Sequence, residues 1–199
     1  MNIQLKNFIL LSKLEINQLL KIVKKQEIMK HISSGKLYSE EDIYNFIKDE
    51  KKQQKISAYK RKYWTWIIKN DKNVIGMFAL YKINISKYKF HTNSLKSKSK
   101  KFKSIKSKKY IGGDISLATR IIIDTEYQGK GIGLIVYNMI KNILNNSIFI
   151  KPKCKITIVS FVNVSNIPGN KLQVKSGFTL VSNYKNDNID RNIYIWKLN

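Results

Sequence analysis

One junction in the sequence limits the folds open to this chain more than any other feature. Residues 115–124, ISLATRIIID, form a mainly apolar run typical of a buried strand. The segment YQGKGIG, residues 127–133, follows and contains three glycines. Apolar residues then recur at helical spacing, on a face made of Ile132, Ile135, Val136, Met139, Ile140, Ile143 and Leu144. The chain must therefore pass from a buried strand to an amphipathic helix through a glycine-rich turn.

Further strands are expected on both sides of this junction. Residues 3–8 form a short apolar run, and two β-rich runs surround the polar turn NDKN between residues 63 and 83. After the helix come the strand CKITIVSFV, a short helix in NIPGNKLQVKSGF that ends at Gly177, and the strands FTLVSNY and NIYIWKL. Alternating strands and helices of this kind predict an α/β domain.

Two helix starts are readable in the N-terminal half. SKLE, residues 12–15, has the form of a capping box, and the helix after it is expected to bury Leu14, Leu19, Leu20 and Val23. SEED, residues 39–42, places three acids where the helix dipole favours them, with Ile43, Phe46 and Ile47 following on one face. These acids are therefore expected to act as helix-end charges rather than as a substrate site.

The composition favours one soluble domain spanning residues 1–199, with a Lys/Ser-rich insertion at about residues 84–110. A single cysteine excludes an internal disulfide, and His31 and His91 are too far apart in sequence to suggest a metal site. The N-terminus lacks the features of a signal peptide, and no apolar run is long enough for a membrane helix. We therefore expect a cytoplasmic protein with no metal and no membrane partner.

The net charge of +25 raises the possibility of nucleic-acid binding. Only three of the 38 basic residues are arginine, namely Arg61, Arg120 and Arg191, whereas proteins that read phosphates and bases rely on the arginine fork. Lys, Asn and Ile are also abundant, and A/T-rich codons encode all three. Genome composition thus explains much of the charge, and binding of nucleic acid or an anionic surface through the insertion remains an alternative.

The glycine segment is suited to holding a phosphate, because the first amides of a helix have no internal partners and glycines let an anion approach the backbone. The P-loop pattern GxxxxGK[ST] is absent, and the dinucleotide pattern GxGxxG fails at Leu134. The pattern QxxGxG is present as Gln128, Gly131 and Gly133. On these residues the sequence resembles the GCN5-related N-acetyltransferase (GNAT) superfamily, whose equivalent segment grips the pyrophosphate of acetyl-CoA.

A second match strengthens the resemblance. Asn166 and the pair Gly177–Phe178, eleven residues later, are similar to the asparagine and closing GF that follow the family's fifth strand. The combined match covers about residues 112–198. The N-terminal half, with its two helices and tryptophan-bearing hairpin, resembles more loosely the branch that acetylates the N-termini of ribosomal proteins.

The resemblance implies a mixed, mostly antiparallel seven-stranded sheet flanked by helices, with the fourth and fifth strands parallel and splayed. It also implies an acetyl-CoA-dependent N-acetyltransferase acting on a primary amine. The residues that it assigns to the cofactor are Ile121, Ile122, Ile123, Gln128, Gly129, Lys130, Gly131, Ile132, Gly133 and Asn166. The backbone amide of Ile121 would also stabilise the oxyanion.

The general base and acid of the family are missing at their expected positions. Leu117 and Phe161 stand where relatives carry a glutamate, and Gln173 and Gly169 stand where they carry a tyrosine or serine acid. Tyr184, in the closing hairpin, is the candidate replacement acid. A weakly basic acceptor is favoured, because a lysine amine costs ~4 kcal/mol to deprotonate near pH 7.4 and an α-amine only ~0.5 kcal/mol. We expect a protein N-terminal α-amine or an amino sugar as the acceptor; a CoA-binding protein with weak catalysis is the alternative.

Overall fold

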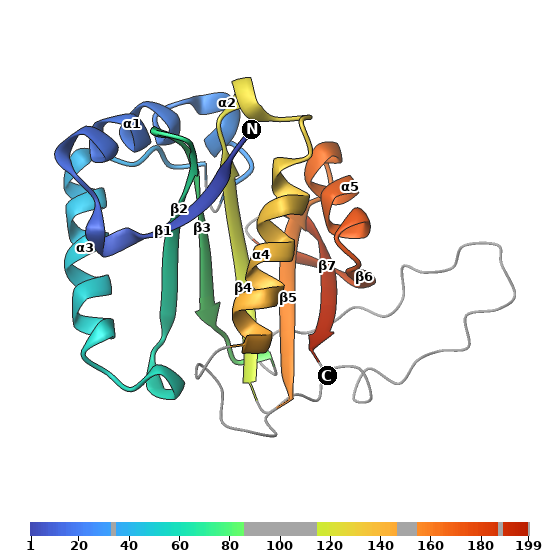
Figure 1. The fold of residues 1–199 in the computed structure, drawn as a ribbon. Helices are drawn as coiled ribbons and strands as arrows, with labels where there is room; N and C mark the ends of the chain where they lie inside the picture. The colour runs from blue at the N-terminus through green and yellow to red at the C-terminus, as the bar shows by residue number, and fades with distance from the viewer. Residues whose placement is uncertain (33–34, 86–114, 147–154, 187–188, 199) are drawn as a thin grey trace, which may run out of the picture. The chain divides into compact units, whose positions relative to one another are not determined.

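A computed structural model describes residues 1–32, 35–85, 115–146, 155–186 and 189–198 (Figure 1). The strands are β1 (Ile3–Asn7), β2 (Tyr63–Asn70), β3 (Asn73–Lys82), β4 (Ile115–Ile123), β5 (Ile156–Asn163), β6 (Thr179–Asn186) and β7 (Ile189–Leu198). The helices are α1 (Lys13–Val23), α2 (Gln26–Met29), α3 (Glu40–Gln54), α4 (Ile132–Asn146) and α5 (Ile167–Lys175), with 3-10 turns η1 (Phe8–Leu10), η2 (Ala58–Lys60) and η6 (Thr125–Tyr127). Most of the predicted Lys/Ser-rich insertion lies outside the described residues.

The strands form one seven-stranded sheet in the order β1-β2-β3-β4-β5-β7-β6. β4 and β5 pair in parallel, whereas the β1–β2, β2–β3, β5–β7 and β6–β7 pairs are antiparallel. The parallel register runs only from Ile115 and Ile156 to Ala118 and Val159, although β4 continues to Ile123 and β5 to Asn163. The predicted mixed sheet, with fourth and fifth strands whose pairing ends partway, is therefore confirmed.

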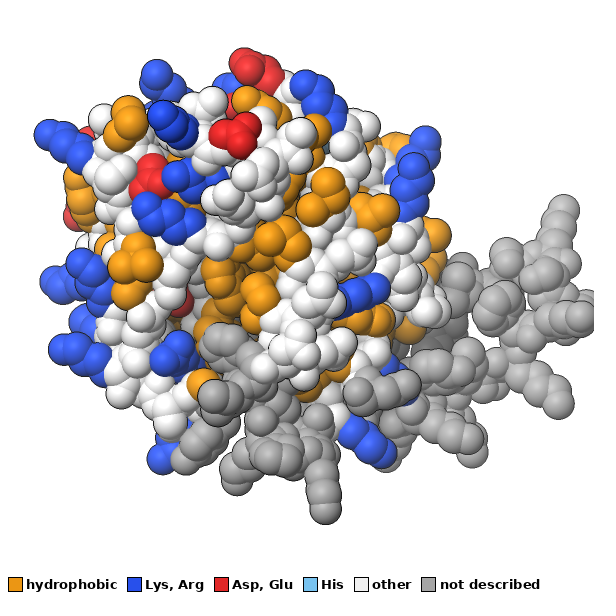
Figure 2. Space-filling model, viewed as in Figure 1, with side chains coloured by type: hydrophobic (Ala, Val, Ile, Leu, Met, Phe, Trp, Pro, Cys, Tyr) orange, Lys and Arg blue, Asp and Glu red, His pale blue; other side chains and the backbone are white. Residues whose placement is uncertain are grey.

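Basic side chains of the described residues are spread over the face of the molecule that Figure 2 draws. Figure 2 shows Lys and Arg in several separate groups on the face that it draws. A nucleic-acid site is expected to gather its cations along one face or stripe. Nucleic-acid binding stays a prediction, since most of the insertion on which it depends is not described. Among the described helices, none combines the length and apolar character that crossing a membrane requires.

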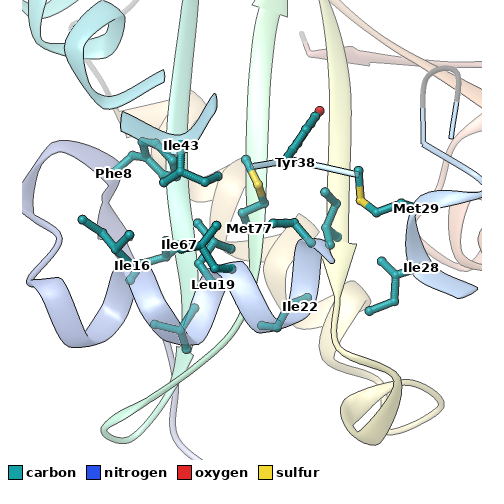
Figure 3. Close-up of a cluster of buried hydrophobic side chains, with 14 of the residues drawn as sticks. Phe8, Ile16, Leu19, Ile22, Ile28, Met29, Tyr38, Ile43, Ile67 and Met77 are labelled. Carbon is teal, nitrogen blue, oxygen red and sulfur yellow. The ribbon is translucent and has the colours of Figure 1, made fainter. Parts of the chain in front are cut away.

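The described residues divide into two compact units. The first comprises Met1–Tyr81 and Arg120–Lys151, and the second comprises Lys82–Thr119 and Pro152–Asn199. In the first unit, α1, α2 and α3 cover one face of the sheet and bury a cluster that includes Leu19, Ile67 and Met77 (Figure 3). The neighbouring Phe78 points to the opposite face, where its ring meets Tyr137 of α4 edge-on at 5.7 Å.

In the second unit Asn170 fixes the start of α5. Its Oδ1 accepts hydrogen bonds from Asn192 Nδ2 at 2.7 Å and from the Tyr194 hydroxyl at 2.9 Å. Its Nδ2 donates to the carbonyls of Asn163 and Asn166 at 2.9 and 2.8 Å. One amide side chain thus ties the helix to β7 and to the end of β5, and thereby sets the position of Asn166.

In the first unit the sequence predicted a capping box at Ser12 and Glu15 and, at SEED, a helix start with acids in its first turn. The box at Ser12 and Glu15 is present, and a second joins Ser39 to Asp42 within the SEED segment. Three apolar assignments were wrong: Leu14 is 67% exposed, Phe46 is 38% exposed and Ile135 is 41% exposed. The buried face of α1 instead includes the charged Glu15, which a search for apolar periodicity does not count.

The carboxylate of Glu15 forms ion pairs with two lysines of the first unit. Its two oxygens accept from Lys69 and Lys6, each at 2.7 Å, and the second oxygen also accepts from the Ser12 amide. Burial acts to raise the pKa of Glu15, but the hydrogen bonds from the two lysines and Ser12 outweigh it and lower the pKa to about 2. One acid therefore joins β1, β2 and the first turn of α1.

Replacing Glu15 by Gln should lower the free energy of unfolding at pH 7 by about 2–3 kcal/mol, because two partly buried ammonium groups lose their counter-charge. The folded pKa lies below the ordinary value of 4.5, so this stability is present above pH 4.5 and is lost as the pH falls toward 2. Urea denaturation between pH 7 and pH 2.5 measures the difference. Asp49→Asn, at an exposed pair 3.4 Å from Lys52, is the control and should change stability by less than about 0.5 kcal/mol. An equal loss at both pH values would contradict the assignment.

A second buried acid, Glu50 of α3, accepts a hydrogen bond from the part of β2 that extends beyond its pairing with β1. β1 pairs with β2 no further than Trp66, so the next edge amide, that of Thr65, donates instead to Glu50 Oε1 at 3.3 Å. Glu50 Oε2 has no partner among the described residues. Burial raises the pKa of Glu50 to about 7, although the hydrogen bonds from Thr65 oppose the shift.

Because this carboxyl has a raised pKa, it lowers stability as the pH rises from 4.5 through 7. Glu50→Gln keeps an oxygen for the Thr65 amide without the charge. Its stability relative to the native protein should therefore rise by about 3 kcal/mol between pH 4.5 and pH 9. Denaturation curves across this range test the expectation, with the exposed Glu41→Gln as a control that should show no such change. A pH-independent difference for Glu50→Gln would refute it.

Candidate active site

The loop between β4 and α4 begins at Asp124, whose backbone and side chain both form hydrogen bonds. The Asp124 amide donates to the Ile75 carbonyl of β3 at 2.8 Å. Its Oδ1 accepts from Thr125 Oγ1 at 3.2 Å and, more weakly, from the Glu126 amide at 3.4 Å, which stabilises the turn η6. Gln128 Nε2 closes the turn by donating to the Ile123 carbonyl at 2.8 Å. The first predicted residue of the glycine motif thus holds the loop by its side chain.

The next five residues present their backbone amides without intramolecular acceptors. Gly129 and Gly131 have φ angles of 74° and 78°, a conformation that favours glycine, and an added Cβ at either would meet nothing within 4 Å. Bonding of the helix type starts with Leu134 and Ile135, which donate to the Gly131 carbonyl. Within the described chain the amides of residues 129–133 donate to no group. Such a concave run at a helix N-terminus is suited to an anion.

The strand that leads into this loop approaches its neighbour closely. A Cβ at Gly76 of β3 would collide with the carbonyl oxygen of Ile122, so only glycine fits there. The Ile122 side chain is buried in the cluster under α1–α3, whereas Ile121 and Ile123 are half-buried and alternate with it. Of the three predicted cofactor residues on this strand, Ile122 is therefore restricted to backbone contacts.

The side chain of Lys130 adds positive charge beside the loop. Its ammonium lies 5.3 Å from the centre of the Tyr127 ring, which is a cation–π distance. The tyrosine thereby holds a cation next to the unpaired amides. The predicted residues Ile121, Ile122, Ile123 and Gln128 to Gly133 all lie in the first unit and form one continuous segment with these properties.

Asn166 belongs to the second unit, where it is the N-cap of α5. Its Oδ1 accepts from the Gly169 amide at 3.0 Å, and a Cβ at Gly169 would lie 2.6 Å from Asn166 Nδ2. The glycine at the position of the family's serine is thus required by the cap. The Nδ2 group of Asn166 donates to no described residue, which leaves it able to serve a ligand.

Tyr184 also belongs to the second unit, but it lies within β6 rather than in the hairpin loop expected for it. β6 extends to Asn186 because Tyr184 and Lys185 keep register with Arg191 and Asp190 of β7. The Tyr184 ring meets Phe161 of β5 at 6.4 Å and 62°. The candidate acid therefore lies beside the strand position at which relatives carry a base.

The sequence has no acid or base at the positions where the family carries them. The structure shows what surrounds the residues that stand there. Leu117 and Gln173 are buried, and the Gly169 amide is used by the cap of α5. Two groups near the glycine loop were not anticipated: Lys25, which pairs with Asp124, and Arg120, whose Nη1 donates to the Tyr38 hydroxyl at 2.9 Å. Both contacts join segments some 80 or more residues apart, so no local pattern announces them.

Comparison with solved structures identifies the fold. An N-acetyltransferase from Staphylococcus aureus Mu50 matches with a TM-score of 0.61 and 13% identity, covering 100% of both chains. Spermidine N-acetyltransferase from Vibrio cholerae, solved with CoA and spermine, matches with a TM-score of 0.61 and 16% identity over 98% of this chain and 94% of that one. The N-acetyltransferase PseH of Campylobacter jejuni, solved with acetyl-CoA, matches with a TM-score of 0.56 and 20% identity over 100% of both.

These matches show the architecture of the chain. The chain has the fold of the GCN5-related N-acetyltransferases, as the QxxGxG motif predicted. No protein-family model matches the chain, and no curated protein matches it in sequence. The resemblance to the branch that acetylates ribosomal-protein N-termini is not confirmed.

Proposed function

We propose that this protein is an N-acetyltransferase that uses acetyl-CoA to acetylate a primary amine. The observation that carries the proposal is the run of unpaired amides at residues 129–133, which follows β4 in a fold shared with N-acetyltransferases solved with CoA or acetyl-CoA. Gly129 and Gly131 leave the approach to these amides open, since no Cβ covers it. A diphosphate fits a site with these donors.

We assign the other contacts with the cofactor to residues before and after this run of amides. The backbone of Ile121 and Ile123 would bind the pantetheine arm as an added strand would, and Asn166 would donate its Nδ2 to the same arm. Lys130 would contribute charge at the phosphates. The backbone amide of Ile121 would donate to the oxygen on which negative charge develops during acyl transfer. When bound, acetyl-CoA supplies the acetyl group as a thioester, and the chain's own task is to orient the amine and handle its proton.

The acceptor we propose is a weakly basic amine, either a protein N-terminal α-amine, as in the ribosomal branch, or an amino sugar. The support is the absence of a carboxylate at Leu117 and Phe161, where apolar side chains cannot take a proton from a lysine ammonium. Solved proteins of this fold include a spermidine acetyltransferase and an aminoglycoside acetyltransferase, which illustrates the range of amines that it accommodates. Polycationic acceptors are disfavoured here by the charge of +25.

A second candidate is a CoA-binding protein with weak catalysis. Leu117 and Gln173 favour it, because they are buried at the positions where relatives carry ionisable groups. Stabilisation by acetyl-CoA without thiol release on any amine would identify this alternative.

Release of free CoA thiol from acetyl-CoA is the direct test of the function. We expect turnover of a peptide with a free N-terminus or of an amino sugar, and at least tenfold slower turnover of an N-blocked peptide with one lysine at equal concentration, because the lysine amine is ~3.5 kcal/mol harder to deprotonate than an α-amine. Gly131→Ala tests the cofactor site: it places a Cβ on a backbone of φ 78° at the amide run, at a cost of ~1–2 kcal/mol, and should weaken CoA binding about tenfold in calorimetry. Faster turnover of the lysine peptide would reverse the proposed preference.

Tyr184→Phe tests the proposed acid that protonates the departing thiolate. We expect kcat to fall at least tenfold while the dissociation constant of CoA stays unchanged, because the hydroxyl is removed and the ring contact with Phe161 is kept. Tyr44→Phe, at an exposed tyrosine of α3, is the control and should keep the native rate. A native rate in Tyr184→Phe would exclude the hydroxyl from the reaction.

A further inference from the structure

An ion pair connects the junction of α1 and α2 to the start of the glycine loop. Lys25 Nζ lies 2.6 Å from Asp124 Oδ1, with the two side chains 28% and 14% exposed. The residues are 99 positions apart in the chain and belong to the same unit. The pair is thus partly shielded from water, where screening is weaker than at an exposed pair.

The position of Asp124 creates an electrostatic difficulty for any anion bound by the loop. Its carboxylate caps η6, and the exposed Glu126 follows two residues later, so two negative charges precede the amide run closely along the chain. A diphosphate held by residues 129–133 would be repelled by that charge. The cap is nevertheless needed, because it sets the turn from which the loop departs.

Lys25 is held in place to counter this charge. Its amide donates to the Ile22 carbonyl, and its own carbonyl accepts from the amides of Ile28 and Met29, all at 3.1 Å. Ile22, Ile28 and Met29 are buried in the cluster of the first unit, so the backbone of Lys25 is fixed by the core. The hydrogen bond to Asp124 raises the pKa of Lys25, which therefore stays charged at neutral pH.

We propose that Lys25 is a charge-compensating, positioning residue of the diphosphate site. It acts through Asp124: by cancelling that carboxylate it lets the capped turn adjoin an anion without repelling it. The inference rests on the proposed function and deepens it, because it adds to the cofactor site a residue that lies outside the glycine motif and more than 100 positions before it.

Binding of CoA, measured by calorimetry at 50 mM KCl on the full chain, tests the proposal. Lys25→Met should weaken binding at least tenfold, and the loss should shrink in 0.5 M KCl, where the uncompensated carboxylate is screened. Lys25→Arg should bind as the native chain does. The double variant Lys25→Met with Asp124→Asn should recover to within about threefold of native affinity, since the amide still caps η6 but carries no charge. Lys36→Met, at a pair 3.4 Å long whose lysine is 69% exposed, is the matched control and should have no effect.

The single variant Asp124→Asn gives an independent reading if Lys25→Met folds poorly. Asparagine keeps the cap and releases the charge of Lys25, so CoA binding should be equal to native or tighter, whereas a purely structural pair would weaken binding when either partner is lost. Native binding by Lys25→Met, or a double variant no better than Lys25→Met, overturns the inference and leaves the proposed function intact. A native chain that binds no CoA overturns both.

Discussion

At the start of α4 the backbone N–H groups of five successive residues, 129–133, donate to no acceptor within the described residues, as is usual for the first amides of a helix. The surrounding structure is arranged to hold them in that state. Gly129 and Gly131 turn the chain through positive φ, Gln128 ties the turn to the end of β4, and Asp124 ties it to β3. The close packing of Gly76 against Ile122 fixes the strand from which the loop departs. Together these contacts keep the five donors available to an acceptor from outside the chain, as the proposed function requires.

The sequence predicted those parts of the fold that depend on neighbouring residues. The strand before the glycines, the helix after them, the cap at Ser12 and the end of α5 at Gly177 each follow from local patterns, and the structure has them. Faces were predicted less well. The buried side of α4 includes Tyr137, which periodicity omitted, and excludes Ile135, because the ring of Phe78 determines how the helix sits on the sheet.

Contacts between distant residues were beyond sequence reasoning for a physical reason. Glu50 is buried because β1 ends early and leaves the Thr65 amide at an open edge, and neither the length of β1 nor the position of α3 is written in the residues near Glu50. The pairing of Lys25 with Asp124 likewise depends on how α1 and α2 cross the sheet. In a chain with 38 basic residues, no composition argument selects the lysine that pairs with Asp124.

The candidate site differs from the family pattern at the two positions where relatives carry a general base. Leu117 and Phe161 are apolar, so under the proposed function proton removal would depend on an acceptor amine that loses its proton readily or on groups from other elements. The contact of Tyr184 with Phe161 brings a hydroxyl-bearing ring to one of these positions. A site of this kind would accelerate the reaction by orienting the amine and by backbone donors to the developing oxyanion, more than by a strong base.

The distribution of charge also determines which positions can change. Only 13 residues are acidic, and four of them, Glu15, Asp42, Glu50 and Asp124, accept backbone amides at helix ends, at a turn or at an open sheet edge. Exposed lysines such as Lys36 and Lys52 form only long surface pairs of 3.4 Å. Exchange of these two for asparagine or isoleucine is therefore expected to change the internal hydrogen bonding less than loss of any of the four carboxylates.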